Sequence, residues 1–201
     1  RTADPAAVAA MEDIVANGAD RDLCRINVLA FARKRGLGTD AALAAFLHAA
    51  RLGIFEMAWN VLCPGCGGVL DANASLNAVH QEVYTCALCA TGYEPTLDEM
   101  VEVVFTVSPR IRRIAAHDPA SLPPFEFYRQ IYWSTGVDLP EEGLEEALEE
   151  ATLDLLELPS GQKAFLTVLL PEGNIVCFEP VTHAAHFLHV TGPPTRERQA
   201  L

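Results

Sequence analysis

The sequence has no hydrophobic run of the length that a transmembrane helix needs. The longest apolar stretch of the 201 residues begins at Ala41, reaches Leu47 and continues past His48, well short of the roughly 18 residues that span a bilayer. An export signal is missing as well, because the N-terminal RTADPAAVAAMED has no basic end followed by an apolar run. We therefore expect no membrane partner.

Catalytic motifs are also missing. The sequence shows no glycine-rich phosphate-binding loop, no nucleophile elbow around a serine, and no convincing pair of general acid and general base. We therefore expect this chain to catalyse no reaction by itself.

Positive charge is absent from the middle of the chain. Residues 63–100 contain no Lys or Arg, and the whole sequence has a formal net charge of −13. Residues 141–201 hold three basic and eleven acidic side chains, six of the latter in EEGLEEALEE. A negative field of this kind repels phosphate backbones and anionic lipids, which argues against nucleic acid as a partner.

Among the patterns that the sequence does contain, the first is a helical periodicity in residues 1–53. The predicted helices run from Pro5 to Gly18, from Asp20 or Asp22 to Arg35, and from Thr39 or Asp40 to Gly53. The second would place Leu23, Ile26 and Ala30 on one face, and in the third an apolar repeat joins Leu43, Phe46, Leu47 and Ala50. A tight RGLG turn between these two helices gives the outline of a helix-turn-helix.

Strand patterns dominate the rest of the chain. IFEMAWNVL alternates apolar and polar residues directly before Cys63, and EMVEVVFTV is the next strand candidate. TLDLLEL, KAFLTVLL, NIVCFE and HFLHV are short apolar runs separated by Pro/Gly turns, which indicates an antiparallel sheet or sandwich; residues 141–151 are ambiguous. We expect an α+β fold with a helical region over 1–53, a zinc ribbon with its leading strand over 54–98, and a β-rich domain over 99–201.

Four of the six cysteines form two CxxC pairs. Cys63, Cys66, Cys86 and Cys89 have the spacing C-x2-C-x19-C-x2-C, which is typical of a four-cysteine zinc site. Two disulfides, free thiols or an iron site of the rubredoxin type are the alternatives. We predict one zinc ion per chain. Because a catalytic zinc keeps one position for water, whereas four cysteines close the shell, we expect this zinc to be structural.

Nucleic-acid binding is the main competing function for a zinc ribbon beside a helix-turn-helix. Four thiolates around Zn²⁺ add a net charge of −2 to a segment without Lys or Arg. The recognition helix would offer only His48 and Arg51 to bases. The basic cluster Arg33, Lys34 and Arg35 has a second explanation, because cations are favourable at the end of a helix.

Three further groups carry weaker signals. His183, His186 and His189 are three residues apart, which makes no tidy three-ligand site on either a strand or a helix. The aromatic run FEFYRQIYW favours core over a pocket or partner surface. Cys24 and Cys177 sit in apolar patterns and are expected to be buried thiols.

Three stretches of the sequence share one resemblance: FARKRGLGTDAALAAFLHAARLGIFEMAWNVLCPGCGGVLDANASL, YTCALCATGYEPTLDEMVEVVFTVSPRIRRIA and FEPVTHAAHF. They resemble a bacterial domain of uncharacterised function that precedes the catalytic domain in class III adenylate/guanylate cyclases. It covers roughly Val28 to Gln199, and the four cysteines carry over as presumed zinc ligands.

The resemblance implies a cytoplasmic, multidomain and homodimeric protein whose C-terminal part makes a cyclic nucleotide. The metal-binding aspartates of that catalytic part match no position here, so no catalytic residue carries over. The chain starts without Met and stops at PTRERQAL, and we expect it to be a piece of such a protein. Its role would be a zinc-binding regulatory or assembly module. The alternative is a stand-alone DNA-binding protein, and a small ligand in the C-terminal sheet is compatible with the first role.

Overall fold

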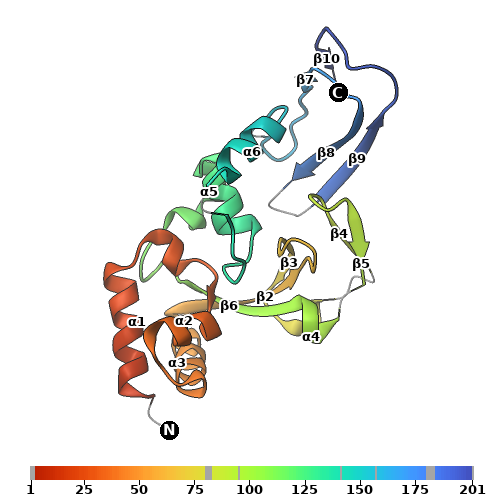
Figure 1. Cartoon of the computed structure of the whole chain (residues 1–201). Coiled ribbons are helices and arrows are strands. Elements are labelled where there is room, and N and C mark those ends of the chain that lie inside the picture. The colour runs from red at the N-terminus through yellow and green to blue at the C-terminus, as the bar shows by residue number, and fades with distance from the viewer. Residues whose placement is uncertain are drawn as a thin grey trace. The chain divides into compact units, whose positions relative to one another are not determined.

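The computed structural model describes residues 3–79, 83–94, 96–140, 142–156, 158–179 and 184–200. The chain forms two compact units, Arg1–Asp138 and Leu139–Leu201. Helices and antiparallel strands occur together (Figure 1), so the expected mixture of α and β structure is confirmed. No helix in the described ranges is long and apolar enough to cross a membrane.

Helix α1, Pro5–Asn17, follows the predicted first helix. The side chain of Asp4 accepts hydrogen bonds from the backbone N–H groups of Ala6 and Ala7, and Pro5 occupies the first turn. Both features stabilise a helix N-terminus, because the first N–H groups have no partner within the helix. The helix ends at Gly18.

The prediction of a second helix from Asp20 or Asp22 to Arg35 is wrong for the first half of that range. A 3₁₀ turn, Asp20–Leu23, and the short strand β1, Ile26–Asn27, precede helix α2, which covers only Val28–Arg35. Arg25 has a φ of 49°, a left-handed conformation that breaks a right-handed helix. The side chain of Asn27 then caps α2 by accepting from the N–H of Ala30. Leu23, Ile26 and Ala30 therefore share no helix face.

Helix α3, Thr39–Arg51, follows α2 after a turn in which Gly36 has a φ of 65°. Its buried residues are Ala42, Ala45, Phe46 and Ala49. Leu43 and Leu47, assigned to the apolar repeat, are 39% and 45% exposed. The small alanines let α3 pack closely, so the helix turns the larger leucines outward. The helix-turn-helix remains a prediction for α2 and α3.

One four-stranded antiparallel sheet organises the first unit. It contains β2 (Phe55–Leu62), β3 (Val69–Asn73) and β6 (Val101–Val107) in the order β1-β6-β2-β3, and the short helix α4, Leu97–Met100, leads into β6. The two strands predicted from IFEMAWNVL and EMVEVVFTV are thus present and pair with each other over their length. This sheet takes strands from all three of the regions expected from the sequence, 1–53, 54–98 and 99–201.

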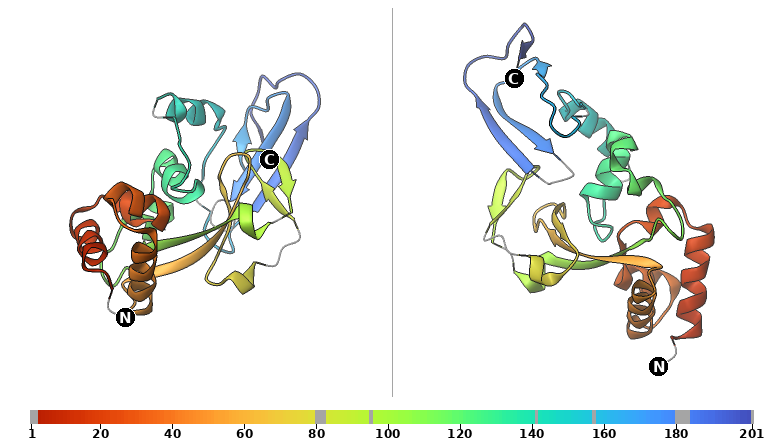
Figure 2. Two further views of the ribbon diagram at one scale, coloured as in Figure 1. Left: turned by 60° about the horizontal axis from the view of Figure 1, so that its bottom comes forward. Right: turned by 180° about the vertical axis from the view of Figure 1, so that it is seen from behind.

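Two hydrophobic clusters occupy the two ends of the long strands. Phe46 of α3 packs its ring 5.1 Å from Phe55 and 5.2 Å from Phe105, in a cluster that also includes residues of α1 and α2. Figures 1 and 2 show these three helices together at one end of β2 and β6. A second cluster at the other end joins Val61, Leu70, Tyr84 and Met100 to the cysteines.

The remainder of the first unit is a hairpin and a run of short helices. The hairpin pairs β4 (Tyr84–Cys86) with β5 (Thr91–Tyr93). Short 3₁₀ turns occur at Leu76–Ala78, Ala115–His117 and Pro119–Ser121, followed by α5 (Pro124–Phe127) and a π-helical turn, Tyr128–Tyr132. FEFYRQIYW is therefore helical, and its Tyr132 and Trp133 belong to the buried core.

Among its described residues, the second unit contains one helix and two small antiparallel sheets. The ambiguous residues 141–151 contain helix α6, Leu144–Ala151. Strands β8 (Gly173–Glu179) and β9 (Ala184–Val190) form one hairpin, and β7 (Thr167–Val168) pairs with β10 (Gln199–Ala200). Two two-stranded sheets thus stand where a single sheet or sandwich was expected. TLDLLEL forms no strand among the residues that the structure describes.

Candidate metal centre

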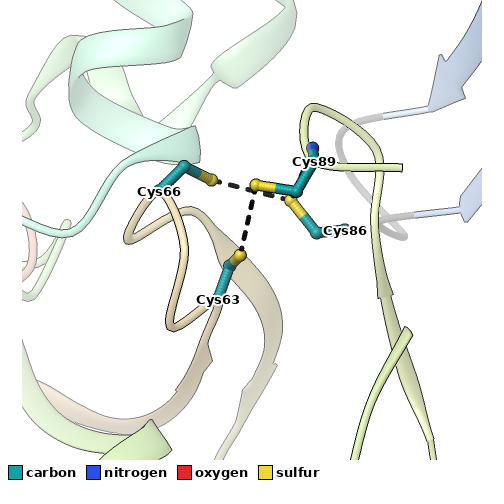
Figure 3. A group of neighbouring side chains, drawn as sticks. All are labelled: Cys63, Cys66, Cys86 and Cys89. Carbon is teal, nitrogen blue, oxygen red and sulfur yellow. Dashed lines mark hydrogen bonds between the residues drawn. The ribbon is translucent and has the colours of Figure 1, made fainter. Parts of the chain in front are cut away.

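The first cysteine pair lies in a tight turn between β2 and β3. The backbone N–H of Gly67 donates to the carbonyl of Cys63, and the N–H of Cys63 donates to the carbonyl of Gly68, both at 2.8 Å. Gly67 has a φ of 69°, which favours glycine. This turn points the side chains of Cys63 and Cys66 to the same side (Figure 3).

The second pair lies in the turn of the β4–β5 hairpin. Cys86 ends β4, and the backbone N–H of Cys89 donates to the sulfur of Cys86 at 3.4 Å. Ala90 follows with a φ of 50°, which turns the chain back into β5. The two turns face each other, as Figure 3 shows.

All four predicted sulfurs converge. Each lies within 4.8 Å of the other three, with 3.7 Å between Cys63 and Cys89 and 3.6 Å between Cys66 and Cys86. Zn–S bonds of about 2.3 Å in a tetrahedron place the sulfurs about 3.8 Å apart. The cysteines are unpaired thiols, not disulfides. The site therefore fits a tetrahedral metal ion, and zinc and iron both accept this donor set.

Hydrogen bonding and burial separate the pKa values of the thiols. The hydrogen bond from Cys66 lowers the pKa of Cys86 to about 4, and the same bond raises the pKa of Cys66. Desolvation raises the pKa of Cys89 to about 11. Without a metal, one thiolate is stabilised by hydrogen bonds, while its neighbours Cys66 and Cys89 keep their protons.

Two tyrosines lie against the sulfurs and were missed by the sequence analysis. The hydroxyl of Tyr132 is 3.5 Å from the sulfur of Cys86. The hydroxyl of Tyr93 hydrogen-bonds to Cys63, which raises the pKa of that hydroxyl to about 12. Tyr93 could have been suspected because it follows Cys89 closely in the sequence. Tyr132 is more than 40 residues away from the second CxxC pair, and no sequence pattern pointed to it.

Other residues considered from the sequence do not join the site. His186 and His189 are exposed on β9, where His189 contacts the side-chain oxygen of Asn174 at 2.8 Å; His183 lies outside the described residues. Cys24 is buried as expected, whereas Cys177 is only half-buried. Within the described ranges, no other group of three or more His, Cys, Asp or Glu side chains is close enough to hold a metal.

The sequence between the two CxxC pairs contains a further motif. His80 and Glu82 form a His-x-Glu triplet, an element that zinc deaminases combine with cysteine ligands, the glutamate carrying protons. Both residues lie outside the described part of the chain. Four converging cysteine sulfurs complete a tetrahedral shell without a histidine.

Comparison with known proteins identifies one relationship. Residues 1–201 match a family of unknown function, DUF5939. No curated protein and no solved structure matches the chain.

Proposed function

Because the chain belongs to DUF5939, a family of unknown function, its role must be inferred from the site, and we propose that it is a zinc-binding, non-catalytic module. The convergence of Cys63, Cys66, Cys86 and Cys89 within 4.8 Å carries this proposal. Four thiolates fill a tetrahedral shell and leave no position for water or substrate, as in structural zinc sites.

Zinc is proposed over iron, and the two are easily distinguished. Zinc has a filled d shell and gives a colourless site, whereas a ferric tetrathiolate absorbs visible light. Protein purified without added metal should contain close to one zinc per chain by elemental analysis and should show no visible absorption. A coloured protein that contains iron would show that the site binds iron and not zinc.

The module is further proposed to regulate or assemble a bacterial adenylate/guanylate cyclase. The support is the resemblance of the CPGCGG and YTCALCATGYEP segments to the domain that precedes the catalytic domain in those enzymes. Its partner would then be the cyclase domain of the same polypeptide, in a cytoplasmic homodimer.

Activity measurements test the cyclase assignment. Residues 1–201 alone should form no cyclic nucleotide from ATP or GTP with Mg²⁺ or Mn²⁺. The natural gene product should form one, and deletion of residues 1–201 should change its activity or its dimerisation. A gene product without a cyclase domain would remove the assignment and leave the metal-binding module.

A nucleic-acid-binding protein is the second candidate, favoured by the tight Gly36 turn between α2 and α3. Two observations weigh against it. The last turn of α3 offers only His48 and Arg51 as basic groups. The basic cluster at the end of α2 is partly engaged, since Arg35 pairs with Asp13 at 2.7 Å. An acidic module should pass through a heparin column at low salt, whereas a nucleic-acid binder should be retained.

A further inference from the structure

The cysteine site is negatively charged when zinc is bound, and the segment that contains the cysteines has no cationic side chain to balance this charge. Four thiolates and one Zn²⁺ leave a net charge of −2, and residues 63–100 contain no Lys or Arg. A charge in a partly buried place needs hydrogen-bond donors around it. The donors at this site include the backbone N–H of Cys89 and the hydroxyls of Tyr93 and Tyr132.

Tyr132 is held in place for such a bond. Its side chain is 1% exposed, and its ring meets the rings of Tyr128 and Trp133 edge-on at centroid distances of 5.6 Å. The first cysteine turn leaves room for the tyrosine ring at Gly68, which has no side chain. A Cβ atom added to Gly68 would lie only 2.6 Å from the ring. The hydroxyl reaches Cys86 only because a glycine stands at this position.

The segment around Tyr132 packs along the first cysteine turn. Gly68 forms an isolated β-bridge with Trp133, and the N–H of Ser134 donates to the carbonyl of Gly67 at 3.1 Å. The side chain of Val137 lies against Gly67 so closely that a Cβ there would be 2.1 Å from it. Gly67 and Gly68, in the turn between Cys66 and β3, are thus contacted by Tyr132, Trp133, Ser134 and Val137.

We propose that Tyr132 is a positioning residue of the metal centre, and that metal binding holds residues 128–138 on the cysteine turns. This inference rests on the proposed metal binding. A metal-bound thiolate has no proton, so the tyrosine hydroxyl donates and the Cys86 sulfur accepts. The bond orients Cys86 and offsets part of the negative charge. Loss of the metal removes the convergence of the two turns and with it the surface on which the segment lies.

The same segment has anchors that do not involve the cysteines. The hydroxyl of Ser134 donates to the carboxylate of Glu102 at 2.8 Å, and the guanidinium of Arg25 donates to the carbonyl of Ile131. These bonds tie the segment to β6 and to the start of β1. Removal of the tyrosine hydroxyl alone should therefore leave the chain folded. The segment ends at Asp138, where the first compact unit ends.

Metal affinity tests the role of the hydroxyl. Zn²⁺ affinity would be measured by competition with a chromophoric chelator for the wild type and for Tyr132→Phe, which keeps the ring. The variant should bind zinc about 10-fold more weakly, the lower end of the effect of losing a hydrogen bond to a ligand. Tyr84→Phe is the matched control, because Tyr84 is buried to a similar extent, at 2% exposed, and its hydroxyl donates to Asp71 at 3.1 Å. The control should change the affinity less than Tyr132→Phe.

Hydrogen exchange tests the coupling to the segment. In the zinc-loaded wild type the N–H of Ser134 should exchange slowly, and chelation should accelerate exchange throughout residues 128–137 while α1 stays protected. Wild-type protein that binds zinc, with an unchanged Tyr132→Phe affinity or unchanged exchange after chelation, overturns this inference alone. A wild-type chain that binds no zinc overturns the proposed function and this inference together.

Discussion

The sulfur of Cys66 lies 3.6 Å from the sulfur of Cys86, although the two residues come from turns that are separated by β3, a 3₁₀ turn and β4. The distance is too long for a disulfide, which needs about 2.05 Å, and it matches an edge of a metal–thiolate tetrahedron. Cys63 and Cys89 repeat the relationship at 3.7 Å. Each cysteine of one turn thus faces a cysteine of the other.

Zinc affinity should rise steeply with pH. The pKa of Cys66 is raised by its hydrogen bond to Cys86, and desolvation raises the pKa of Cys89 to about 11. Both thiols hold protons at neutral pH and must release them when a metal binds. At least two released protons predict an increase of at least about 100-fold in affinity per pH unit. Competition titrations between pH 6 and 8 measure this slope, and a pH-independent affinity would contradict it.

Substitution of a cysteine ligand should loosen the region around the site. Cys63→Ser is expected to lose stoichiometric zinc and to make residues 54–100 sensitive to proteolysis, because metal binding stabilises small zinc modules by about 10–16 kcal/mol. Cys177→Ser is the control, since Cys177 lies in β8 of the second unit. Limited proteolysis with mass mapping locates the cuts. A metal-free protein that resists protease would refute the structural role of the zinc. The hydrophobic cluster of Val61, Leu70 and Met100 would then be enough to keep this region folded.

Alkylation should distinguish three classes of thiol. In the zinc-loaded protein at pH 8, iodoacetamide should add once, at Cys177, because four cysteines are bound and Cys24 is buried. Burial raises the pKa of Cys24 to about 11, so it stays protonated and unreactive. Chelation should expose the four ligands and add up to four more groups. Intact-mass spectrometry counts the adducts, and modification of Cys24 in the folded protein would contradict the structure.

Adjacent residues of α3 should differ strongly in their effect on stability. Phe46 is fully buried against Phe31, Phe55 and Phe105, so Phe46→Ala should lower the free energy of unfolding by about 3–5 kcal/mol. Leu47 is 45% exposed, and Leu47→Ala should cost well under half of that. Urea unfolding of both variants measures the difference. Equal losses would mean that α3 presents another face to the sheet.

Affinity for nucleic acid should be negligible. Gel shifts with DNA and RNA at low ionic strength give the most permissive conditions, because release of counterions strengthens such binding there. We expect no shift at micromolar protein. Binding that weakens steeply with salt, and that is lost when Arg33, Lys34 and Arg35 are replaced by Ala, would favour the alternative function.

Local sequence chemistry determined a large part of this protein. Asp4 and Pro5 start α1, alternation in IFEMAWNVL produces β2, and the two CxxC pairs identify the candidate metal ligands. These features act over a few residues, so spacing alone reveals them. The same reasoning failed where strand pairing overrode helical periodicity, at Ile26 and Asn27, whose backbone partners in β6 are about 80 residues away.

Only the tertiary structure decided what surrounds the metal centre. Sequence spacing cannot show that Tyr132 reaches Cys86, or that Gly68 leaves space for the ring, because these residues meet through the packing of distant segments. Periodicity also pointed to the wrong face of α3, because it favoured Leu43 and Leu47, which are exposed, although alanines repeat at helical spacing as well. Close packing against Phe55 and Phe105 selected the alanine face with Phe46, because the small alanines let the helix approach the sheet closely enough for the ring of Phe46 to reach the other two rings.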